Sequence, residues 1–124
     1  MIDAVRLEAW LAHYKTAWEQ RDAKLAASLF SATATYQETP FDAPLAGPAG
    51  IHDYWARVTA DQRDIHFSAR PLAVAGDSAV AEWSATFRSA ASGARIDLEG
   101  VFVLEFDAGG LCSRLREWWH VRQR

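Results

Sequence analysis

The chain of 124 residues lacks most of the features that mark specialised classes of protein. Its single cysteine, Cys112, excludes an internal disulfide and is typical of a reducing compartment, so we expect a cytoplasmic protein. No hydrophobic run approaches the length of a membrane span, and the first residues lack the pattern of a secretory signal. The net charge of −3 disfavours nucleic acid and acidic membranes as partners, because both require concentrated Lys and Arg.

Signals for metal ions and nucleotides are missing as well. The histidines have no metal-ligand spacing, and no second cysteine joins them. The segment 47–50 does not match a phosphate-binding loop, and no serine lies in a GxSxG elbow. We therefore expect neither a metal ion nor an organic cofactor.

Aromatic residues, by contrast, are abundant: six Trp, six Phe and three Tyr. So many rings serve either a tightly packed core or the wall of a ligand pocket, and composition alone favours neither. Their spacing indicates helices in the first half of the chain. One stripe follows a plausible N-cap at Asp3 and contains Leu7, Trp10, Leu11, Tyr14, Ala17 and Trp18.

Two shorter helices and a strand are expected next. Asp22 is suited to cap a helix whose inward residues are Leu25, Leu29 and Phe30. A β-rich run over 33–39 stops at Pro40. After a loop over 41–49, Pro48 favours the start of a third helix, with one face formed by Ile51, Tyr54, Trp55 and Val58.

Beyond residue 64 the hydrophobic period changes from helix to strand. Four strands are predicted at about 64–75, 79–89, 94–106 and 111–121, joined by turns rich in Gly, Asp and Ser. A change of parity near Pro71 suggests a β-bulge and leaves His66 unplaced. Helices followed by an antiparallel meander are typical of one α+β domain, here spanning 1–124, with the helices on one face of the sheet.

Strand alternation predicts which side chains face the helices. The inward residues of the strand predicted at 79–89 include Trp83 and Phe87, and those of the strand at 94–106 include Phe102. In the last strand, Leu111, Ser113, Leu115, Glu117 and Trp119 are expected opposite Cys112 and Trp118. Small inward residues are expected to leave room for a cavity: Ala81, Ala85 and Gly100.

Two carboxyl groups interrupt these apolar faces. Glu117 does so in the last strand, and Glu38 shares a face with Tyr36 in the first. A buried carboxyl has a raised pKa, and a Glu raised to about 6–7 acts as a general acid or base near neutral pH. Tyr14 can direct its hydroxyl into the same space. The alternative is structural: either Glu lies at the rim or pairs with an arginine or a tyrosine.

With these residues in view, the chain resembles the nuclear transport factor 2-like superfamily, in its SnoaL-like and ketosteroid isomerase-like group. The resemblance covers nearly the whole chain and depends on Tyr14, Asp22 with Leu29-Phe30, Tyr36 to Pro40, Gly50-Ile51 with Tyr54-Trp55, Gly76-Asp77, Gly100 to Leu104, and Leu115 to Trp119. It implies a cone-shaped, cystatin-like α+β fold: three N-terminal helices on a curved, mainly antiparallel sheet that encloses a pocket. It specifies function poorly, because the superfamily includes isomerases, hydrolases, cyclases and binding modules.

Two catalytic patterns of related enzymes match in part. The resemblance to ketosteroid isomerases puts Tyr14 at the enolate-binding tyrosine and Glu38 at the proton-transferring aspartate, but Phe102 replaces their second donor. The residues from Tyr36 to Pro40, with Glu117, resemble the water-activating set of limonene-1,2-epoxide hydrolase. Residues 82–85 lack that enzyme's Arg-x-Asp pair, so neither mechanism transfers whole.

Three functions therefore stay open. The first is a cofactor-independent isomerase or epoxide-hydrolase-like enzyme for a small hydrophobic molecule, with Glu38 as base, Glu117 as second acid–base group, and Tyr14 and Tyr36 as donors. Its pocket walls would be Trp18, Trp55, Trp83, Phe87, Phe102 and Trp119. The second is a non-catalytic binding module that uses the same pocket. The third is a dimerisation module, since the apolar centre and opposite charges of the outer sheet face suit a homodimer, a common assembly in the resembled family.

Overall fold

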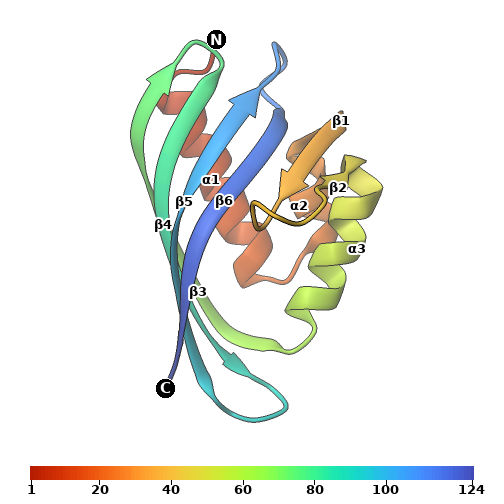
Figure 1. Ribbon diagram of the computed structural model, residues 1–124, viewed down its shortest axis with the longest axis vertical. Helices are drawn as coiled ribbons and strands as arrows, with labels where there is room; N and C mark the ends of the chain where they lie inside the picture. Colours follow the sequence, from red (N-terminus) through yellow and green to blue (C-terminus); the bar gives the residue numbers. More distant parts are fainter.

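A computed structural model describes all residues, 1–124, as helices packed on one face of a curved sheet (Figure 1). The helices are α1 (Ala4–Glu19), α2 (Ala23–Ser28) and α3 (Gly47–Thr59). The strands are β1 (Phe30–Gln37), β2 (Leu45–Ala46), β3 (Gln62–Ala75), β4 (Ser78–Ser89), β5 (Arg95–Phe106) and β6 (Cys112–Gln123). In the sheet they lie in the order β2-β1-β6-β5-β4-β3, and every neighbouring pair is antiparallel except β1 and β6. The α+β fold expected from the sequence is confirmed. No helix is long and apolar enough to cross a membrane.

The helices begin where their capping residues predict. The Asp3 carboxylate accepts a hydrogen bond from the Arg6 backbone N–H at 2.8 Å, and Asp22 accepts one from Leu25 at 2.9 Å. Pro48 lies in the first turn of α3, where its missing N–H costs nothing. The second helix is shorter than the pattern suggests, because it ends at Ser28 and Phe30 is already the first residue of β1.

The long strands agree with their predicted ranges to within two residues. The bulge near Pro71 is confirmed, since the β3–β4 register shifts between Pro71 and Ala73. Two predictions in the first part of the sheet are wrong. β1 runs over Phe30–Gln37 and not over 33–39, so Glu38 lies beyond its end. The loop after it contains the two-residue strand β2, which is too short to show a period.

The start of β6 also departs from simple alternation. The β5–β6 register shifts between Glu105 and Phe106, which adds a residue to β6 near Ser113. Cys112 is therefore fully buried, while Leu111 is exposed, the reverse of the prediction. From Leu115 onward the predicted parity holds, and Glu117 faces inward.

One hydrophobic core joins the helices to the inner face of β3–β6. Gly100 does not leave the space that its small size suggests. A Cβ atom built on it would lie 2.5 Å from the Trp118 carbonyl oxygen and 2.8 Å from the Trp119 Cβ. Glycine is therefore required here because β6 passes unusually close to β5, and this approach sets the position of Trp119.

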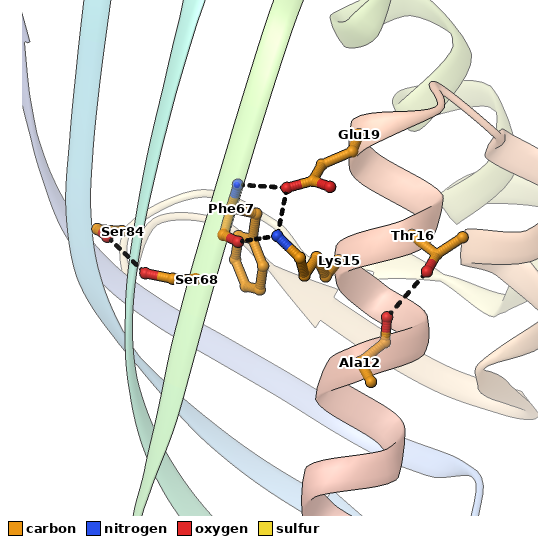
Figure 2. Close-up of polar contacts among 7 residues, drawn as sticks. All are labelled: Ala12, Lys15, Thr16, Glu19, Phe67, Ser68 and Ser84. Atoms are coloured by element: carbon orange, nitrogen blue, oxygen red, sulfur yellow. Dashed lines mark hydrogen bonds and ion pairs between the residues drawn. The ribbon is translucent and has the colours of Figure 1, made fainter.

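A pair of charged side chains joins α1 to the outermost long strand (Figure 2). The Lys15 ammonium donates to the Phe67 carbonyl oxygen at 2.8 Å, and Glu19 Oε2 accepts from the Phe67 N–H at 2.9 Å. The two side chains also pair with each other at 2.6 Å. Both backbone groups of Phe67 are thereby bound by α1, which fixes the distance between the helix and β3.

Candidate functional site

A cavity of about 280 Å³ lies between α1, α3 and the inner face of the sheet. Its volume is near the lower end of the range of about 300–1,000 Å³ that is usual for small-molecule sites. Sixteen residues line it, of which twelve are hydrophobic: Tyr14, Trp18, Tyr36, Glu38, Tyr54, Trp55, Val58, Thr59, Gln62, Trp83, Phe87, Ile96, Leu98, Glu117, Trp119 and Val121. Val58 and Val121 are exposed, whereas Tyr14, Tyr36 and Glu117 are buried, so the cavity runs inward from the first pair to the second group.

The aromatic wall is formed by α1, α3 and β4. Tyr14 and Trp18 are one helical turn apart on α1, and Trp55 meets both rings edge to face at 5.2 and 5.6 Å between centroids. Trp83 of β4 packs against Trp18 at 5.8 Å. These contacts fix the rings in place, so the wall is rigid before any ligand arrives. The residues that line the cavity include Trp18, Trp55, Trp83, Phe87 and Trp119.

Phe102 is the one expected wall residue that does not line the cavity. It is completely buried, and its ring stacks on Trp83 at 5.3 Å and lies 5.2 Å from Tyr14. Trp83 and Tyr14 stand between it and the open space, because strand alternation gives the face of a residue but not its depth. Phe102 therefore supports the wall from behind.

Two tyrosine hydroxyls form the polar centre of the site. Tyr14 of α1 and Tyr36 of β1 are both buried, and their oxygens are 3.1 Å apart. Burial, and after it the nearby Glu117, raises the pKa of both hydroxyls well above the ordinary value, so both stay protonated. Whichever hydroxyl donates within the pair, the other keeps its proton for a further acceptor.

Glu117 of β6 is the buried acid of the site, with a relative exposure of only 6%. Burial and then the charge of Glu38 raise its pKa to about 8, and the nearby Tyr36 hydroxyl, which acts in the opposite direction, does not offset them. Its Oε2 atom has no hydrogen-bond partner. At neutral pH the group is therefore mostly a neutral carboxylic acid that can donate its proton.

Glu38 lies nearer to solvent than Glu117 and is held through its backbone. The Trp119 indole N–H donates to the Glu38 carbonyl oxygen at 3.0 Å, which fixes the chain just after β1. Tyr54 of α3 is close by, and its pKa is raised by burial first and then by Glu38. The structure thus brings both predicted carboxyl groups, Tyr14 and Tyr36 to one cavity.

The structure adds lining residues that sequence reasoning did not select. Tyr54 is one of them, and its place in the apolar stripe of α3 was the available signal. Gln62 accepts a hydrogen bond from the Trp18 indole at 2.7 Å, a contact between distant segments that has no local sequence pattern. The indole N–H groups of Trp55 and Trp83 are buried without an acceptor.

Two other candidates for chemistry lie elsewhere. Burial raises the pKa of the Cys112 thiol to about 12, so this residue is a poor nucleophile. His66, which the sequence left unplaced, is exposed on β3 and does not line the cavity.

Comparison with known proteins places these features in a family. The family model of the SnoaL-like domain matches residues 10–115. No curated protein matches the chain in sequence.

Solved structures of the same fold are numerous. A protein of ketosteroid isomerase-like fold from Catenulispora acidiphila, in complex with trimethylamine, is 20% identical, with a TM-score of 0.75 over 88% of this chain and 83% of that one. SalBIII, an epoxide hydrolase/cyclase-like enzyme of pyran ring formation in salinomycin, is 16% identical, with a TM-score of 0.82 over 98% of both chains. A designed binder of 17-OHP is 13% identical, with a TM-score of 0.77 over 94% of this chain and 96% of that one. At these identities the likeness establishes the fold alone.

Proposed function

The chain belongs to the family of SnoaL-like domains, and on that premise we propose that it is a cofactor-independent acid–base enzyme for a small, mostly apolar molecule. The observation that carries the proposal is Glu117, a buried acid with its pKa raised to about 8 in an aromatic cavity that also holds Glu38. A carboxyl group tuned toward neutrality is an effective proton donor at physiological pH.

The roles follow from position. Glu38, nearer to solvent, is the base that removes a proton from a carbon beside a carbonyl group or from an attacking water. Glu117, deep in the cavity, gives its proton to the oxygen on which negative charge develops. The free hydroxyl proton of the Tyr14–Tyr36 pair donates to the same oxygen. The reaction class is therefore isomerisation of a carbonyl compound or hydration of an epoxide.

Solved structures of similar fold support a pocket of this kind. The Catenulispora protein binds trimethylamine, the designed binder takes 17-OHP, and SalBIII acts in ring formation. Of these ligands, trimethylamine is small enough for a cavity of about 280 Å³, whereas 17-OHP is too large. We accordingly propose a substrate nearer to one ring than to a steroid.

Replacement of either glutamate by glutamine is expected to remove this activity. A panel of small cyclic enones and epoxides is assayed with the wild type, Glu38→Gln and Glu117→Gln, and each variant is expected to lose about 10²–10⁴-fold in rate. Glu8→Gln, on the exposed face of α1, is the matched control and should keep the full rate. Wild-type activity should also fall above about pH 8, as Glu117 loses its proton.

Two results would change the assignment. If both cavity variants keep every activity found, the acid–base roles are wrong. If ligands stabilise the protein and quench its tryptophan fluorescence but no substrate turns over, the pocket is a non-catalytic binding site.

We also propose that two copies associate through the outer face of the sheet, as a cytoplasmic homodimer. Val101 and Val103 of β5 lie in register with Trp118 and Arg116 of β6. The Trp118 side chain is 45% exposed, and the Arg116 guanidinium lies 5.6 Å from its ring centre. An apolar centre with charges around it suits a two-fold contact, in which each patch meets its own copy.

Trp118→Glu is expected to weaken this dimer by at least about 30-fold, since a central tryptophan is commonly worth about 2 kcal/mol or more in an interface. Sedimentation equilibrium at micromolar concentration measures the change. Phe41→Glu, at a residue that is 98% exposed in the loop before β2, is the control and should leave the dimer intact. A wild type that sediments at the monomer mass would refute the proposed contact.

A further inference from the structure

The cavity carries charge of one sign only. Glu38 and Glu117 line it, while no Lys, Arg or His does so. An anionic ligand would lose its water and meet two carboxyl groups, which is unfavourable at both steps. The site therefore selects ligands that are neutral or positive.

Between these two kinds of ligand, the aromatic rings of the cavity favour a positively charged one. Eight of the sixteen lining residues are aromatic, and four of these are tryptophans: Trp18, Trp55, Trp83 and Trp119. The face of an aromatic ring attracts a cation, most strongly for tryptophan and more so when water is excluded. A purely hydrocarbon ligand would need apolar walls but would gain nothing from this concentration of indole rings.

Glu117 supplies a matching polar contact. Its Oε2 atom is buried and has no hydrogen-bond partner, a condition that is costly in a folded protein. The polar groups that act on Glu117 are tyrosine hydroxyls and the carboxyl group of Glu38. A ligand that brings a cationic N–H satisfies both this oxygen and the charge that forms on Glu117.

We propose that the same cavity also binds a small tertiary amine as its ammonium ion, in competition with the carbonyl or epoxide substrate. Its N–H donates a hydrogen bond to Glu117 Oε2 while its alkyl groups pack on the tryptophan rings. The inference depends on the proposed function in that it takes this cavity as the binding site and Glu117 as its buried acid, which loses its proton when the amine binds. The amine enters as its ammonium ion and keeps its N–H, while the O–H bond of Glu117 breaks and that proton passes to solvent water. No oxidation or reduction is involved, and the transfer reverses on release.

The pH dependence of binding distinguishes this complex from one with a neutral ligand. The groups that face Glu117 are Tyr14 from α1, Tyr36 from β1, Tyr54 from α3 and Glu38 from the end of β1. The three tyrosines stay protonated, since burial raises the pKa of each. An alkylamine, like a lysine with its ordinary pKa of about 10.4, is already protonated in water. Its binding near neutral pH therefore releases about one proton from Glu117, and its affinity rises about tenfold per pH unit until about pH 8.

Titration calorimetry with two matched probes tests the inference. N,N-dimethylcyclohexylamine and cyclohexyl methyl ketone have the same number of non-hydrogen atoms, but only the first is a cation. Each is titrated at about pH 6.5 in two buffers of different ionisation enthalpy, which gives the number of protons released. We expect about one proton for the amine and none for the ketone, with the amine bound at least about tenfold more tightly at pH 8 than at pH 6.5.

Variants test whether the proton released on amine binding comes from Glu117. Glu117→Gln is expected to abolish the proton release and to weaken amine binding at least about tenfold, with ketone binding changed by less than about threefold. Glu8→Gln on the exposed face of α1 should change the binding of neither probe. Thermal unfolding of each variant confirms that it is folded before titration.

The outcomes separate the two proposals. If the ketone binds and the amine does not, the amine inference is overturned while the proposed function stands. If the amine binds without proton release, or equally well to Glu117→Gln, the inference is also overturned. If neither probe binds the wild type, both the inference and the proposed cavity site fall.

Discussion

Glu117→Gln is expected to become more stable than the wild type as the pH rises from 4 to 8. At pH 8 the difference in unfolding free energy should reach about 4 kcal/mol. The carboxyl group has an ordinary pKa of 4.5 in the unfolded chain and about 8 in the folded one. Between these values the folded protein holds a proton that the unfolded chain has released, so the wild type loses stability as the pH rises. Each pKa unit corresponds to about 1.4 kcal/mol, and a neutral glutamine is free of this penalty.

Urea unfolding of both proteins across that pH range measures the effect, and the quantity of interest is the difference between them. Asp61, Asp64 and Asp97 have lowered pKa values, so the stability they contribute is lost only in more acidic solution and is common to both proteins. Glu8→Gln, on the exposed face of α1, is the control for the loss of one carboxyl group. A constant difference for Glu117→Gln would mean that the buried acid is not protonated in the fold.

Phe102→Ala is expected to lower the unfolding free energy by about 3–5 kcal/mol, the usual cost of removing a buried aromatic ring. The side chain has no exposure at all and contacts the rings of Tyr14, Phe67 and Trp83. These rings are fixed by their own neighbours and cannot collapse fully into the space left behind. The loss therefore combines missing contacts with a residual cavity directly behind the wall of the site.

Chemical denaturation measures the unfolding free energy of Phe102→Ala, and Phe41→Ala is the control. Phe41 is 98% exposed, so removal of its ring should change stability by less than about 0.5 kcal/mol. A loss below about 1 kcal/mol at Phe102 would show instead that the surrounding rings repack.

The parts of the fold with a regular period were predictable from the sequence. The helix caps at Asp3 and Asp22, the four long strands and the bulge near Pro71 each have a local signal. The errors lie where that signal is interrupted. The extra residue near Ser113 reverses the faces of Leu111 and Cys112, and no residue type in this stretch marks such a shift.

For the candidate site, the sequence predicted which side of each strand a residue points to. It predicted less well how far that residue lies from the cavity. Glu117 was found because a charged residue in an apolar alternation is conspicuous, and the structure gives it an inward position. Glu38 was expected within a strand but lies after it, where the Trp119 indole holds its backbone. Phe102 shows the limit of the method, because its face was correct while two other rings separate it from the cavity. Depth depends on how elements pack, which a single strand does not encode.

The contact of Lys15 and Glu19 with Phe67 has a consequence for how the protein behaves at high concentration. β3 is the long strand at the margin of the sheet, and such a strand offers unpaired backbone groups to any passing chain, a route to aggregation. At Phe67 both groups are already occupied by α1 (Figure 2). Further along, Pro71 has no N–H to offer, and the bulge beside it disturbs the regular spacing that another strand would need. The helix that helps to build the ligand cavity thus also shields the sheet from fibril-like growth.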